Sequence, residues 1–177
     1  MSILGLDIST SNIGYCIFKN GELINAGAIE LPSKKCMFEK AVHTSEILKE
    51  LKKYKISRIL IEENLQSFRS GFSSAKTIST LAKFNGIISY ISNTTFNIKP
   101  EFINVNHARK KCGIKIDRKS KKNTKEQVLE WVSQQPQFKN FDWPTKILKN
   151  GPRRGVTVLK PQCYDIADAA VLCIFAN

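Results

Sequence analysis

The sequence predicts an α/β fold in which a five-stranded mixed sheet carries helices on both faces. Two observations predict it. The chain opens with three short apolar runs joined by turn-forming residues, which indicates antiparallel strands. Apolar runs of strand length then alternate with segments of helical periodicity, and parallel strands need such helical crossovers. With 177 residues the chain is near the common size of one domain, so we expect a single domain over residues 1–177.

Each element follows from local patterns. Three N-terminal strands are expected at 3–8, 14–18 and 23–31, with the strong hairpin signal Asn20-Gly21 between the last two. The later elements are expected as a helix at 37–53, a strand at 58–63, a helix at 74–92, a strand at 101–105, a helix at 126–134 and a closing helix at 164–176. Residues 109–125 are expected to form a flexible basic loop, and residues 136–154 to be largely irregular.

Composition narrows the class of protein. The net charge of +13 comes from 28 Lys and Arg against 15 Asp and Glu, so nucleic acid is the first candidate partner. Five cysteines without a C-x-x-C pair, and two isolated histidines, argue against a disulfide framework, a zinc site or a Ser-His-Asp triad. The chain has no membrane-length apolar run and no secretory signal, so we expect a soluble intracellular protein without a membrane partner.

Four acidic residues stand in apolar surroundings. Asp7 and Glu62 interrupt apolar strands, where an ionised carboxylate costs free energy unless it is paired or binds a cation. Asp165 and Asp168 are three residues apart and share one face of the closing helix. Ordinary ion pairs are one alternative explanation, and N-terminal capping by Asp165 is another. Glu63 competes with Glu62, because only one of two successive strand residues can point with Asp7.

A metal explains the four acids together. A set of carboxylates without His or Cys suits a hard cation, so the cofactor expected is Mg²⁺, with Mn²⁺ able to substitute. Two ions per site, roughly 4 Å apart, would stabilise the attacking and leaving oxygens of a phosphodiester. We therefore predict that Asp7, Glu62, Asp165 and Asp168 are both metal ligands and catalytic residues.

These residues resemble the RuvC-type Holliday junction resolvases of the ribonuclease H-like superfamily, in particular the compact versions carried by phages and large DNA viruses. Gly5-Leu6-Asp7 before a glycine-bearing hairpin looks like the first acidic motif of that family, and Ile61-Glu62 looks like the second. Residues 165–169, which read DIADA, are very similar to its terminal helix motif. The resemblance spans Gly5 to Ala170. It implies a ribonuclease H-like fold, the four acids as the catalytic metal site, and a structure-specific endonuclease that resolves four-way or other branched DNA junctions.

The resemblance also implies DNA contacts. Lys111 and Lys125 match family lysines near the scissile phosphate, and Lys110 could replace Lys111 because the spacing is ambiguous by one residue. Family members often place an aromatic residue three positions after the second acid, whereas this chain has Leu65 there and Phe68 further on. The DNA-binding residues predicted are Phe68, Arg109, Lys110, Lys111, Arg118, Lys119, Lys121, Lys122 and Lys125. The loop at 151–155 is read either as a DNA contact or as a solvated turn.

Other functions compete with this one. An actin-like ATPase or sugar kinase needs a much longer two-lobed chain. A non-catalytic DNA-binding module would need the basic segment but not four acids, and an RNA-processing nuclease of the same fold stays an alternative. A junction has two symmetric strands to cut, so we expect a homodimer, with surplus apolar residues on the 74–92 helix as its contact. Such a nuclease would work in the cytoplasm or nucleoid of a bacterial cell or an infected host.

Overall fold

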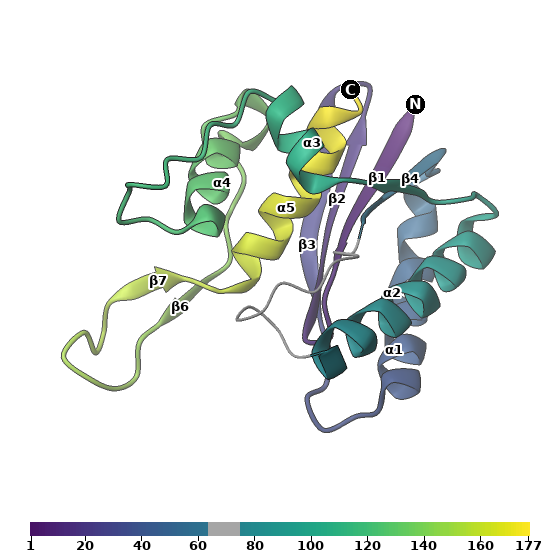
Figure 1. Cartoon of the computed structure of the whole chain (residues 1–177), viewed down its shortest axis with the longest axis horizontal. Coiled ribbons are helices and arrows are strands. Elements are labelled where there is room, and N and C mark those ends of the chain that lie inside the picture. Colours follow the sequence, from purple (N-terminus) through teal and green to yellow (C-terminus); the bar gives the residue numbers. More distant parts are fainter. Residues whose placement is uncertain (64–74) are drawn as a thin grey trace.

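The computed structural model describes residues 1–63 and 75–177. Its main sheet has five strands in the order β3-β2-β1-β4-β5 (Figure 1). The strands are β1 (Ser2–Ile8), β2 (Asn12–Lys19), β3 (Glu22–Glu30), β4 (Arg58–Glu62) and β5 (Glu101–Ile103). β1 to β3 are antiparallel neighbours, while β4 runs parallel to β1 and β5 parallel to β4. The predicted mixed sheet is therefore confirmed.

Helices cover both faces of this sheet. The helices are α1 (Met37–Leu51), α2 (Ala75–Phe96), α3 (Val105–Lys111), α4 (Thr124–Ser133) and α5 (Gln162–Phe175), with short 3-10 turns η1 (Lys52–Tyr54) and η2 (Pro136–Phe138). α1 and α2 pack on one face, and α5 crosses the other with α3 and α4 against it (Figure 1). No helix among the described residues is long and apolar enough to cross a membrane.

Alternation along the strands divides the apolar side chains between two cores. Leu4 and Leu6 of β1 pack with Ile59 and Ile61 of β4 beneath α1 and α2. Their sequence neighbours Ile3 and Leu60 pack on the opposite face with α5. Successive strand residues point to opposite faces, so Asp7 and Glu62 both belong to the face that α5 covers.

The predicted basic loop at 109–125 was wrong at both ends. Residues 109–111 are the last turn of α3, which begins after Asn104, whose side chain accepts a hydrogen bond from the His107 N–H. At the other end, Asn123 and Glu126 form a capping box that starts α4 at Thr124. Paired backbone groups at both helix starts thus outweigh the repulsion among the neighbouring cations.

The segment expected to be irregular, 136–154, contains one strand of a second sheet, and the other strand follows just after it. β6 (Thr145–Ile147) and β7 (Thr157–Leu159) pair antiparallel and project from the body of the protein near the start of α5 (Figure 1). Gly151 and Gly155 in the connection have φ of 80° and 86°, a region that glycine adopts without steric cost. At three residues each, the strands are too short to show an alternating pattern in the sequence.

Candidate active site

Pairing between β1 and β4 brings the first two acids together. Leu6 is the register partner of Ile61, so the next residues, Asp7 and Glu62, lie side by side on neighbouring strands. Both side chains keep part of their exposure to solvent. Glu63 follows the end of β4, where alternation turns it toward the other face of the sheet.

Helix α5 supplies the other two acids. Asp165 and Asp168 lie on the helix face turned toward the sheet and are 9% and 3% exposed. α5 can come this close because Gly14 of β2 and Gly5 of β1 carry no side chain. A side chain on Gly14 would collide with the Asp165 carbonyl group, and one on Gly5 with the Ala169 carbonyl group. Two strand glycines therefore position the aspartates over Asp7 and Glu62.

The capping explanation for Asp165 does not account for this geometry. α5 begins at Gln162 after an N-cap at Pro161, so Asp165 stands inside the helix rather than at its cap position. The helix dipole stabilises an acid in the first turns, but this stabilisation offsets only a small part of the free-energy cost of burying the acid.

Burial and the repulsion of like charges favour the protonated forms of Asp7, Glu62 and Asp165. Burial raises the pKa of Asp7 well above its usual range, and the negative charges of Glu62, Asp168 and Asp165 raise it further. Burial, followed by the charge of Asp168, raises the pKa of Glu62 to about 7. The pKa of Asp165 is also raised, chiefly by burial. Such a group of like charges needs a positive partner to ionise fully.

Two cations from neighbouring helices meet the helix aspartates. Arg109 of α3 donates from Nη2 to Asp168 Oδ1 at 2.8 Å, in a pair whose side chains are only 15% and 4% exposed. Lys125 of α4 places Nζ 3.4 Å from Asp165 Oδ1. Burial alone would lower the pKa of Lys125, but the charges of Asp165, Asp7 and Asp168 outweigh burial and raise it. The acids of the sheet and α5 thus share one electrostatic site with α3 and α4.

The donor chemistry of this site fits a hard divalent cation. All four acids are carboxylates, the ligand type that Mg²⁺ and Mn²⁺ prefer. Within residues 1–63 and 75–177, however, no three potential ligands converge closely enough to hold an ion as they stand. Arg109 and Lys125 engage the two helix aspartates directly.

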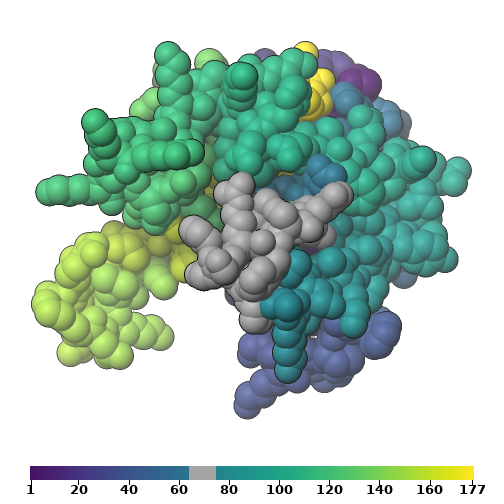
Figure 2. Space-filling view, viewed as in Figure 1, coloured from purple at the N-terminus to yellow at the C-terminus, as the bar shows by residue number. Residues whose placement is uncertain are grey.

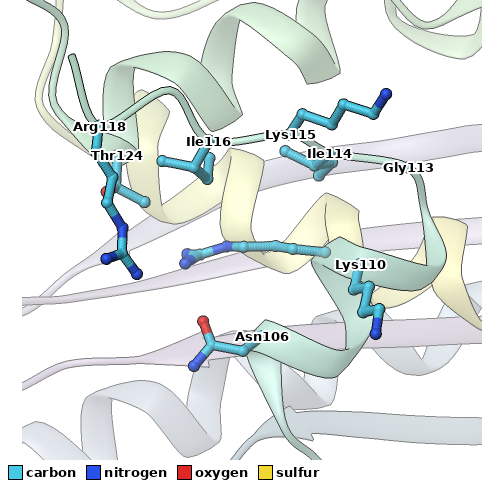
Figure 3. A pocket seen from close by; sticks show the side chains of 9 residues that line it. Asn106, Lys110, Gly113, Ile114, Lys115, Ile116, Arg118 and Thr124 are labelled. Carbon is cyan, nitrogen blue, oxygen red and sulfur yellow. The ribbon is translucent and has the colours of Figure 1, made fainter. Parts of the chain in front are cut away.

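The other predicted DNA-binding cations surround the site unevenly. Lys110 and Arg118 line a hollow of about 420 Å³ between α3 and the chain entering α4, together with Asn106 and Thr124 (Figure 3). Lys119 and Lys121 are exposed on the segment between the two helices. Lys122 forms an ion pair with Glu130 at 2.7 Å. Phe68 lies outside the described residues.

The structure places Arg109 rather than Lys111 beside the acids. The Lys111 ammonium lies over the Phe175 ring, 4.7 Å from its centroid, near the far end of α5. Sequence reasoning included Arg109 among the DNA contacts but missed its ion pair with Asp168. The two residues are far apart in the chain, and nothing in the local pattern links them.

Comparison with known proteins shows what the chain is similar to. No protein-family model matches the chain. Over 94 residues it is 40% identical to a crossover junction endodeoxyribonuclease RuvC from Aliarcobacter butzleri (strain RM4018), a match that covers 50% of this chain and 57% of that relative. The resemblance to the RuvC family is confirmed. The chain thus matches little more than half the length of this curated relative.

Solved structures extend the likeness to the whole chain. RuvC from Thermus thermophilus superposes with a TM-score of 0.60 over 99% of this chain and 92% of its own. The same protein in complex with a Holliday junction substrate gives 0.64 over 99% and 93%. Sequence identity is 12% in both comparisons, so they establish the fold. That fold is the predicted ribonuclease H-like fold.

Proposed function

We propose that this chain is a structure-specific endonuclease that cuts four-way (Holliday) junctions and other branched DNA by metal-dependent phosphodiester hydrolysis. The observation that carries this proposal is the cluster of Asp7, Glu62, Asp165 and Asp168 on one face of the sheet. Two of these side chains are buried, and burial raises the pKa of Asp7, Glu62 and Asp165. A non-catalytic DNA-binding module would have no use for so costly an arrangement.

The four acids would hold the metal. Mg²⁺, with Mn²⁺ as a substitute and two ions in the full site, would supply an activated water and charge stabilisation at the phosphate. Before binding, Arg109 and Lys125 offset the negative charge of Asp168 and Asp165. With a cation on the carboxylates, the side chains of Arg109 and Lys125 would be available to a phosphate oxygen. Lys125 is better suited to follow the phosphate, because its side chain is 55% exposed whereas that of Arg109 is 15% exposed.

The DNA backbone would approach over α3 and α4. Lys110 and Arg118 at the hollow, and the exposed lysines between the helices, provide positive charge beside the acids. Contacts of this kind fix the position of DNA without reading its sequence. We include Lys111, Lys119, Lys121 and Lys122 as anchoring contacts of this surface. A DNA substrate places the activity in the cytoplasm or nucleoid of a bacterial cell or an infected host.

A homodimer would provide two such sites for the two strands of a junction. On α2, Ile88 belongs to the core of the subunit, whereas Ala82 and Tyr90 remain exposed. Part of the apolar surplus expected on this helix is therefore available for a partner copy.

Cleavage of a synthetic mobile four-way junction tests the proposal, with linear duplex and single-stranded DNA as controls and with EDTA replacing the metal. We expect cutting of the junction that requires metal. Asp7→Asn and Asp168→Asn should abolish it, and Glu63→Gln should keep it. Cleavage of linear duplex at the same rate, or of structured RNA in preference to the junction, would overturn the assignment of substrate.

A further inference from the structure

The β6–β7 hairpin, residues 145–159, contributes little to the fold. Its exposed apolar side chains include Ile147, Val156 and Leu159, which are 63%, 43% and 47% exposed. In the space-filling view the hairpin stands away from the rest of the protein (Figure 2). An arm that leaves apolar side chains in water is not explained by packing of the subunit.

The hairpin is nevertheless an ordered structure. Leu148 N–H donates to the Val156 carbonyl at 3.0 Å and Gly155 N–H to the Leu148 carbonyl at 2.8 Å. Its base is anchored by Lys160 N–H, which donates to the Pro144 carbonyl at 2.8 Å. The neighbouring Trp143 packs on Phe138, with ring centroids 5.7 Å apart. The arm is thus a defined projection on a fixed base.

All charged side chains of the hairpin are positive. Residues 143–164 contain five Lys and Arg and no Asp or Glu. Lys146, Lys149, Arg153 and Arg154 are exposed, and none of the four forms an ion pair with any residue in the described ranges 1–63 and 75–177. Lys160 at the base approaches an acid, Glu30, at 4.0 Å. Four uncompensated cations on one arm suit a polyanion.

The position of the arm relates this charge to the cluster of acids. β7 ends at Leu159 and α5, which carries Asp165, begins at Gln162. The arm therefore starts at the end of α5 that forms the proposed active site (Figure 1). The chain from Gly151 to Leu159 spans at most roughly 25 Å when extended, the length of roughly seven base pairs of duplex.

We propose that the β6–β7 hairpin is a second DNA-binding site, which grips the phosphate backbone of a duplex arm of the substrate several base pairs from the scissile phosphate. This rests on the proposed function for the identity of the substrate. The four exposed cations contact phosphates. The exposed apolar side chains of the hairpin lie against the sugars at the edge of the DNA groove that these phosphates border. The hairpin adds affinity and fixes the direction of the duplex arm, while the acids and Lys125 act on the scissile phosphate.

A fourfold variant tests the hairpin, with Lys146, Lys149, Arg153 and Arg154 all changed to Gln. A matched control removes the same charge at the opposite end of the sheet, where Lys49, Lys52, Lys53 and Lys99 are exposed before β4 and β5. Binding to a four-way junction with long arms is measured across a salt titration, and hydroxyl-radical footprints are recorded on each arm. Circular dichroism checks that both variants fold.

We expect the hairpin variant to bind at least tenfold more weakly, with a slope of log affinity against log salt that is shallower by roughly 2 to 4, because each lost phosphate contact removes about 0.9. Its footprint should lose protection roughly seven base pairs from the cut, at the hairpin's reach, and keep protection at the branch. The single-turnover cutting rate at saturating enzyme should stay unchanged. The control variant should keep both footprints.

Two results would overturn the proposal. One is a hairpin variant that retains wild-type affinity and salt slope on a junction that the wild type binds and cuts. The other is an equal loss of affinity in the control variant, which would mean that only total charge matters. A wild type that neither binds nor cuts junctions would instead refute the proposed function, so the two failures are distinguishable.

Discussion

The cluster of acids predicts opposite stability changes for two single substitutions in metal-free protein. Glu62→Gln removes a carboxylate whose ionisation the fold opposes. Asp168→Asn removes the counter-charge of a nearly buried arginine. Both replace one carboxylate by an amide of almost the same shape, so the comparison isolates charge from packing. We expect Glu62→Gln to stabilise the protein at alkaline pH and Asp168→Asn to destabilise it.

The magnitude for Glu62 follows from its pKa. The folded-state pKa is about 7 against an ordinary value of 4.5, a difference equivalent to about 3 kcal/mol. The folded state holds this proton more tightly than the unfolded chain does, so the free energy of unfolding falls as pH rises from 4.5 to about 7. A glutamine does not ionise and escapes this loss. The variant should therefore exceed the wild type by up to about 3 kcal/mol near pH 8 and by almost nothing near pH 4.

The expected change for Asp168→Asn has the other sign. The variant leaves the Arg109 guanidinium mostly buried and without the carboxylate that now lies 2.8 Å away. Removing one partner of a buried pair costs about 3 to 5 kcal/mol, of which relief of repulsion on Glu62 and Asp7 returns a part. We expect a net loss of about 2 kcal/mol.

Urea unfolding in EDTA near pH 4, pH 6 and pH 8 measures both effects. Glu46→Gln is the matched control, because Glu46 is exposed on α1 far from the cluster. A Glu62→Gln protein that is less stable than the wild type near pH 8, or whose extra stability does not change with pH, would contradict the expected effect of this carboxylate. Stabilisation by Asp168→Asn at every pH would show that Arg109 does not depend on that carboxylate.

Three further predictions concern activity and assembly. Asp7→Asn and Asp165→Asn should each lose cleavage while keeping junction affinity within about threefold, because the acids hold metal and the cations hold phosphate; gel-shift and cleavage assays on the same samples decide this. Lys125→Ala should lower the single-turnover cutting rate more than the affinity for the junction. Lys111→Ala should change the cutting rate little, because the Lys111 ammonium lies on the Phe175 ring. Equal cutting rates in the two variants would contradict the placement of Lys125. Ala82→Glu should give a folded monomer by light scattering, since an unpaired charge disfavours an apolar contact; a dimeric variant would move the interface elsewhere.

The larger elements of the fold were predictable because periodicity is a local property. The strands around Asp7 and Glu62 and the closing helix all showed their pattern in the sequence, and so did the hairpin signal at Asn20-Gly21. Helix α3 and the β6–β7 hairpin were not predicted from the sequence, because each is too short to show a hydrophobic period. Their formation depends on backbone pairing and caps that only become visible in three dimensions.

The candidate site was predictable where strand alternation or helix spacing decides it. Alternation showed that only one of Glu62 and Glu63 can point with Asp7, and the family resemblance favoured Glu62. Helix spacing put Asp165 and Asp168 on one face. The ion pair of Arg109 with Asp168 was not predictable, because it depends on how α3 packs against α5. The hollow beside Lys110 was not predictable for the same reason, because its lining residues come from α3, from the chain that follows α3 and from the start of α4.

Metal-dependent cutting is tested by adding metal to a preformed complex of the protein with a mobile four-way junction in EDTA. We expect no cleavage before metal is added, and paired nicks at symmetry-related positions within one turnover of adding excess Mg²⁺ or Mn²⁺. The Asp7→Asn protein should form the same complex and leave the DNA intact. Cleavage that proceeds in EDTA, or a stable complex that cuts the junction with none of the divalent cations tested, would contradict the proposed metal-dependent nuclease.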